Sequence, residues 1–144
     1  MIYLVDGSNV LGRAGADREG VEDKRALLRA AAAFARRRKA RLTLFFDGRQ
    51  PESFASSLGA VRAVFSNGRP ADDLIVDCAQ KDGSREPVRV VTSDSALAAR
   101  VQGRRVEVIR CGEFLSALRE EAGDGVPPED WEHYFSDPKN REQF

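Results

Sequence analysis

Four aspartates stand at the ends or starts of apolar segments, and together they could form one acidic site. They are Asp6 after IYLV, Asp47 after LTLFF, Asp94 after VVTS, and Asp72 at the start of DDLIVDCAQ. A lone aspartate in such a place is usually a turn former or a helix N-cap. Because the carboxyl ends of parallel strands meet at one edge of a sheet, four of them predict a shared crevice.

Carboxylates crowded into one crevice repel each other unless a cation neutralises them. Oxygen ligands favour hard divalent ions, so the cluster predicts bound Mg²⁺ or Mn²⁺. The single histidine argues against a histidine zinc site and a Ser-His-Asp triad. The chain has no glycine-rich phosphate loop, which disfavours a Rossmann dehydrogenase and a P-loop NTPase. Ser8, two residues after Asp6, disfavours a phosphatase of the haloacid type, which would have a second aspartate there.

The elements that must position these acids alternate along the chain. Strands are predicted over residues 2–6, 42–47, 60–66, 88–94 and 105–110, and helices over 22–40, 72–80, 95–101 and 113–121. This order predicts an α/β fold with a central, mainly parallel five-stranded sheet between helices. Glycines and prolines interrupt the pattern after residue 122. We therefore expect one domain over 1–122 and a C-terminal tail over 123–144.

The predicted helix over 72–80 distinguishes among its own acids. Asp72 falls on an otherwise apolar face that should lie against the sheet, so its carboxylate is expected at the helix tip, facing the crevice. Asp73 falls on the neighbouring face and could still reach a metal, whereas Asp77 lies one turn farther along and is expected in solvent. The alternative for Asp72 and Asp73 is a favourable charge at a helix N-terminus.

Composition limits the class of protein. The chain has 144 residues with 42% hydrophobic content, which suits one domain with a sizeable core. It has neither an apolar run of membrane-spanning length nor a signal-peptide pattern at its start, so we expect a cytoplasmic protein. Cys78 and Cys111 stand in no metal-binding spacing, and both are expected to be reduced and buried or half-buried.

Four segments in order resemble the motifs of YacP-like NYN domains, a branch of the PIN-like nucleases. They are LVDGSNVLG (4–12), FFDG (45–48), FSNGRPADDLIVD (65–77) and VVTSD (90–94). The resemblance covers about residues 1–120. It implies a PIN-like three-layer α/β/α fold and a metal-dependent endoribonuclease. The substrate would be single-stranded or messenger RNA, and some members of the family act at the ribosome.

The resemblance also implies roles for individual residues. The catalytic acids would be Asp6, Asp47, Asp72 and Asp94, and the metal ligands Asp6, Asp72 and Asp94. The auxiliary residues would be Asn9, Asp73, Ser66 and Ser93, with the amide and the two hydroxyls positioning water or phosphate. The family pattern often has a glutamate four residues after the first helix aspartate, and this chain has Val76 there.

An acidic site needs positive charge nearby to attract an anionic strand. The candidates are Arg13 and Arg18 in the predicted loop after the first strand, and Arg69 before the acidic helix; each could instead be a solvated loop arginine. The basic run ARRRKAR (35–41) closes a helix at the opposite edge of the sheet. It either complements the helix dipole or docks a distal RNA segment or an acidic partner.

Three functions follow from these features. The first is an endoribonuclease in which a metal-activated water attacks phosphorus, leaving 5′-phosphate and 3′-hydroxyl ends. The second is a non-catalytic module that binds RNA or the ribosome, which Val76 and the zero net charge favour. The third is a Mg²⁺-dependent phosphohydrolase acting on small phosphate esters.

Overall fold

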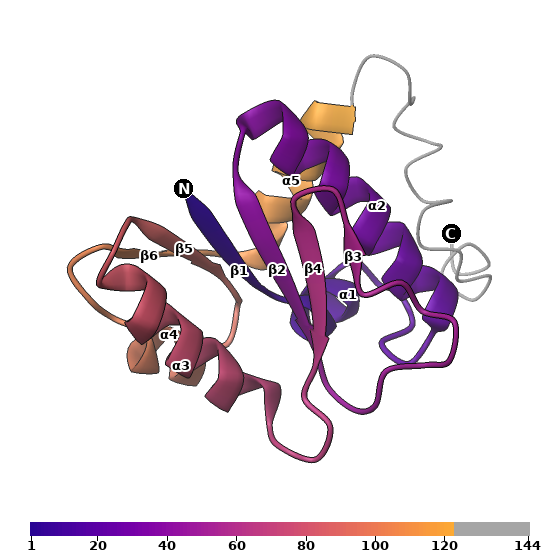
Figure 1. Cartoon of the computed structure of the whole chain (residues 1–144), viewed down its shortest axis with the longest axis horizontal. Coiled ribbons are helices and arrows are strands. Elements are labelled where there is room, and N and C mark those ends of the chain that lie inside the picture. The colour runs from indigo at the N-terminus through magenta and orange to yellow at the C-terminus, as the bar shows by residue number, and fades with distance from the viewer. Residues whose placement is uncertain (123–144) are drawn as a thin grey trace.

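The computed structural model describes residues 1–122, and its elements form one sheet with helices on both faces (Figure 1). The strands are β1 (Ile2–Asp6), β2 (Arg41–Phe46), β3 (Ser57–Leu58), β4 (Val61–Phe65), β5 (Val88–Val91) and β6 (Val106–Ile109). The helices are α1 (Gly7–Arg13), α2 (Val21–Arg38), α3 (Ala71–Gly83), α4 (Ser95–Arg100) and α5 (Cys111–Ala122). The predicted tail over 123–144 lies outside the described residues.

The sheet has the strand order β3-β4-β2-β1-β5-β6. The pairings of β1 with β2 and β5, of β2 with β4, and of β5 with β6 are parallel, and β3 pairs antiparallel with β4. Every residue of β1 is buried, as expected for a central strand covered on both faces. The predicted mainly parallel α/β fold is confirmed.

Two apolar cores lie on opposite faces of the sheet and define three layers. One core joins the sheet to α1, α2 and α5, and includes Phe34, Phe46 and Phe114. The other joins it to α3 and α4, and includes Ile75 and Leu97. Figure 1 shows α2 and α5 side by side on one face, with α3 and α4 on the other. The three-layer arrangement expected from the resemblance is therefore present.

Two elements were not predicted. The sheet has six strands rather than five, because β3 is only two residues long and leaves no periodic signal. Helix α1 follows β1 directly, although GSNVLGR is rich in residues with low helix propensity. It forms because the Asp6 carboxylate accepts a hydrogen bond from the Asn9 amide as its N-cap, and because Val10 and Leu11 are fully buried. Arg13 is therefore the last residue of a helix rather than part of a loop.

The strand predicted over 88–94 ends earlier than expected, at Val91. The Thr92 amide still donates to the carbonyl of Ile109 in β6, at 2.9 Å, so one further hydrogen bond to the sheet follows the end of β5. Asp94 then begins α4, where its carboxylate accepts hydrogen bonds from the amides of Ala96 and Leu97. Asp94 is consequently a helix N-cap beyond the strand end, not the last residue of the strand.

Cys78 is half-buried and Cys111 is buried, and both are free thiols as predicted. None of the helices within residues 1–122 is both long enough and apolar enough to cross a bilayer.

Candidate active site

The four aspartates come together at the carboxyl edge of the sheet. Asp6 is the last residue of β1, and Asp47 directly follows β2, its neighbour in the sheet. Helix α3 begins at the same edge, because the Ala71 amide donates to Asp47 Oδ1 at 3.1 Å. This places Asp72 in the first turn of α3 next to Asp47. Asp94 lies in the segment that follows β5, the strand that pairs with β1 on the side away from β2.

The electrostatics of Asp6 and Asp72 reflect how near the acids lie to one another. The pKa of Asp6 is raised from 3.8 to about 6, chiefly by burial, with smaller increases from the charges of Asp72 and Asp47 and opposing effects of the hydrogen bonds from Asn9 and Thr92. Burial also raises the pKa of Asp72, followed by the charges of Asp94 and Asp47. The cluster thus carries more negative charge than its surroundings neutralise.

Asp6 is held by a threonine that the sequence did not single out. The Thr92 hydroxyl donates to Asp6 Oδ2 at 3.2 Å and accepts a hydrogen bond from the Asp94 amide at 3.1 Å. Thr92 is only 1% exposed, so water cannot replace it. One hydroxyl therefore links the two acids contributed by β1 and by the segment after β5.

Asn9 and Ser93 connect three segments behind the acids. The Asn9 side-chain oxygen accepts hydrogen bonds from the Ser93 amide, at 2.7 Å, and from Cys111 Sγ, at 3.1 Å. The Ser93 hydroxyl accepts one from the Cys111 amide at 3.0 Å. These contacts join α1, the β5–α4 turn and the start of α5. The same sequence motif that suggested Asn9 gave no indication of Cys111, which lies 102 residues away.

Two other serines hold the turn after β2. The Ser8 hydroxyl accepts from the Asp47 amide and the Ser66 hydroxyl from the Gly48 amide, both at 3.2 Å. Gly48 has φ +93°, a conformation that favours glycine. As acceptors of these bonds, the hydroxyls of Ser8 and Ser66 fix the backbone that carries Asp47.

The other acids of α3 are arranged differently. Asp73 forms an ion pair with Arg100 at 2.9 Å, and Asp77 is exposed and contacts Arg69 at 3.4 Å. The solvated position expected for Asp77 is confirmed. Val76 is buried in the apolar core under α3, so the position where the family often has a glutamate carries no carboxylate here.

The candidate RNA-binding arginines are all exposed. Arg13 ends α1, Arg18 lies between α1 and α2 with its guanidinium against Gly12, and Arg69 precedes α3. A further arginine, Arg49, follows Asp47 and lines a groove of about 680 Å³ that also includes Asn67. Its place two residues after a strand-end aspartate is a sequence signal that could have identified it.

The donor set fits a hard divalent cation in its chemistry. Within residues 1–122, no three acidic, histidine or cysteine side chains are arranged to hold one metal ion together. Mg²⁺ does not require such a set, because it keeps several waters and binds through one or two carboxylates and substrate phosphates. A carboxylate as buried as Asp6, facing other carboxylates, gains most from a cation.

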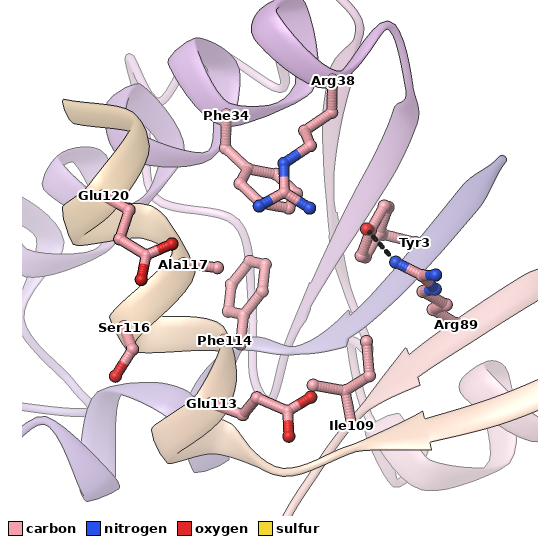
Figure 2. A pocket seen from close by; sticks show the side chains of 10 residues that line it. All are labelled: Tyr3, Phe34, Arg38, Arg89, Ile109, Glu113, Phe114, Ser116, Ala117 and Glu120. Atoms are coloured by element: carbon pink, nitrogen blue, oxygen red, sulfur yellow. Dashed lines mark hydrogen bonds between the residues drawn. The ribbon is translucent and has the colours of Figure 1, made fainter. Parts of the chain in front are cut away.

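A separate pocket of about 270 Å³ lies on the face of the sheet that α2 and α5 cover, between these helices and β1, β5 and β6 (Figure 2). Its floor is apolar and includes Phe34 and Phe114. Arg89 donates to the Tyr3 hydroxyl at 2.8 Å, and Arg38 lies over the Phe34 ring. This pocket contains none of the four aspartates, so it is not part of the acidic site.

Comparison with known proteins agrees with the fold. A crystal structure of Rae1 (YacP) from Bacillus subtilis superposes with a TM-score of 0.70 at 20% identity, covering 85% of this chain and 75% of that one. The structure of its W164L mutant gives a TM-score of 0.66 at 20% identity, covering 99% and 96%. No curated protein matches the chain. The model of the YacP-like NYN domain matches residues 3–126, and the chain therefore belongs to the YacP-like NYN domain family.

Proposed function

We propose that this protein is a Mg²⁺- or Mn²⁺-dependent endoribonuclease. The observation that carries the proposal is the convergence of Asp6, Asp47, Asp72 and Asp94, where burial and then the neighbouring acidic charges raise the pKa values of Asp6 and Asp72. Family membership supports it, since the NYN family implies a PIN-like ribonuclease. The Rae1 structures support the fold alone.

Each residue of the site has a definable task under this proposal. Asp6, Asp72 and Asp94 would hold the cation, which when bound supplies Lewis-acid chemistry and an acidified water. Asp47 fixes the start of α3 through the Ala71 amide, and so orients Asp72. Thr92 orients Asp6.

The residues around the acids would guide the RNA. We expect the exposed arginines Arg13, Arg18 and Arg69 to supply positive charge near the acids and to contact RNA phosphates. Asn9, Ser66 and Ser93 set the backbone around the crevice, and Asp73 would act as an auxiliary acid held by Arg100.

The direct test compares two aspartates of the same helix. Asp72→Asn should lower cleavage of a labelled single-stranded RNA by at least about 100-fold in Mn²⁺ or Mg²⁺, because it removes a ligand. Asp77→Asn, at an exposed position on α3, should cleave like the wild type. EDTA should stop cleavage, and the products should carry 5′-phosphates. Equal activity of the two variants would refute the assignment of the acids.

A second function is favoured by one specific observation. Val76 is buried in the apolar core and Asp73 is neutralised by Arg100, so two positions near the cluster contribute no free carboxylate. A non-catalytic RNA- or ribosome-binding module would bind RNA with an affinity that falls with salt, but would form no products at saturating metal. Metal-dependent turnover excludes this module.

Thr92 offers a test of positioning rather than of direct participation. Thr92→Val removes the hydroxyl that donates to Asp6 and accepts from the Asp94 amide. We expect cleavage to fall by about 10- to 100-fold, and the acid limb of its pH profile to move to higher pH, because the Asp6 anion loses a donor. Thr92→Ser should restore both. A profile that keeps its position in Thr92→Val would show a purely structural role.

A further inference from the structure

The edge of the sheet opposite the acids, where the strands begin, carries a concentration of exposed basic residues. We call it the amino edge. It is formed by the C-terminus of α2, the start of β2, and the loops that lead into β5 and β6. Its unpaired basic residues are Arg36, Arg37, Lys39, Arg85, Arg104 and Arg105.

Backbone hydrogen bonds show that these segments are neighbours in space. The Arg41 amide donates to the Met1 carbonyl, at 3.1 Å, and the Val88 amide to the Arg105 carbonyl, at 2.8 Å. The Arg105 guanidinium also donates to the Arg85 carbonyl at 3.1 Å. Since neighbouring strands lie about 4.8 Å apart, the positive charge extends roughly 15 Å from β2 to β6.

The acids near this edge do not neutralise it. Glu86 pairs with Arg41, Glu107 with Arg89 and Glu121 with Arg38, at 2.7, 3.1 and 2.7 Å. Arg38 and Arg89 are the two arginines of the pocket in Figure 2. Each of the three glutamates is therefore already paired with an arginine outside the set of six.

What remains at the amino edge is a positive excess. None of the six basic residues forms an ion pair within the described part of the chain. The acids at this edge that are likewise without one are Asp82 and Glu120. In a chain whose formal net charge is zero, this excess is a local feature and not a reflection of composition.

The helix dipole explains only part of it. Arg36 and Arg37 occupy the last turn of α2, where positive charge is favourable. Arg104 and Arg105 lie in the loop before β6, beyond any helix end, and line a groove of about 330 Å³ with Met1 and Pro87. Separate segments of the chain therefore contribute charge of the same sign to one surface.

We propose that the amino edge binds the phosphate backbone of a structured RNA, at the end of the domain opposite the acids. Arginine matches phosphate through paired N–H donors, and a duplex carries one negative charge per about 1.7 Å of its axis. Roughly 15 Å of duplex thus presents several phosphates to this surface. The proposed function enters only in the choice of RNA as the polyanion, since the charge pattern itself is independent of cleavage.

The test measures the salt dependence of binding with charge-matched variants. Arg37→Gln/Arg104→Gln removes two positive charges from the amino edge. Arg29→Gln/Arg110→Gln removes two exposed positive charges away from that edge, one in the middle of α2 and one after the end of β6. Binding of a labelled RNA hairpin is followed by fluorescence anisotropy in EDTA between about 50 and 200 mM salt. The slope of log K against log salt should fall by about 2 in the edge variant and stay unchanged in the control.

The outcomes separate this inference from the proposed function. Equal slopes for the two double variants would overturn it. If the edge variant loses binding of polyglutamate but keeps its RNA affinity, the surface serves an acidic protein and the inference is also wrong. Cleavage of a short single strand is expected to survive in the edge variant. If the wild type cleaves nothing but the slopes still differ, the proposed function fails and the RNA surface stands.

Discussion

Asp6→Asn is expected to remove cleavage, by at least about 100-fold, and at the same time to stabilise the protein at neutral pH. Both effects have one cause. Asp6 is 6% exposed and lies among other carboxylates, so its negative charge destabilises the folded state relative to the unfolded chain. An asparagine keeps the size and an acceptor oxygen for the Asn9 amide but carries no charge.

The direction and size of this effect on the free energy of unfolding follow from the pKa of Asp6. A folded-state pKa of about 6, above the ordinary 3.8, means that the folded protein holds this proton more tightly than the unfolded chain. The contribution of Asp6 to stability is therefore greatest below about pH 4, falls as the pH rises through the window from 4 to 6, and is constant above it. At 1.36 kcal/mol per pKa unit, the penalty above pH 6 is up to about 3 kcal/mol.

Chemical unfolding of the wild type and Asp6→Asn from pH 4 to 8 measures this effect. The variant should be more stable at pH 8 and should show a much smaller fall between pH 4 and 6, the remainder coming from Asp72, whose pKa is also raised. Asp77→Asn should keep the whole fall, because Asp77 is exposed. Mg²⁺ at about 100 times its Kd should stabilise the wild type by about 2.7 kcal/mol and Asp6→Asn much less. A wild-type stability that is flat across this window would contradict the unneutralised charge.

Gly7→Ala is expected to be the most damaging single-methyl change near the site. A Cβ at this position would lie 2.5 Å from Phe46 Cε1 and 2.9 Å from the Phe45 carbonyl oxygen. Phe46 is fully buried, so neither its ring nor the β2 backbone has room to move. We expect a loss of about 1–3 kcal/mol in unfolding free energy. The added methyl group would push α1 away from β2 and so separate Asp6 from Asp47. A displacement of about 1 Å in an active site costs roughly 100-fold in the rate of the reaction.

The matched control is Gly112→Ala in α5. A Cβ there meets nothing within 4 Å, so this substitution should be neutral or should stabilise by up to about 1 kcal/mol through helix propensity. Thermal unfolding and RNA cleavage of both variants measure the contrast. If the two alanine variants are equally stable, the close approach of α1 to β2 at Gly7 does not constrain the fold.

The sequence was sufficient to place the acids but not their supports. Asp6 and Asp47 follow apolar runs, and the rule that parallel strands end at one edge is enough to bring them together. Thr92 and Cys111 act through residues more than 80 positions away, and no local pattern encodes such contacts. Helix α1 was missed because burial of its apolar residues outweighs the low propensity of its glycines.

The central position of β1 has a consequence for the order in which the domain is completed. Ile2 pairs on one side with Arg41 and on the other with Val88, so β1 is complete only once a partner from the last third of the described chain has been made. Such distant pairing forms late, because a long loop must close before its contacts are gained. A nascent chain ending before β5 holds Asp6 and Asp47 but lacks Asp94 and the Thr92 hydroxyl. Under the proposed function, the growing polypeptide is thus inactive toward the message that encodes it until translation of the domain is almost finished.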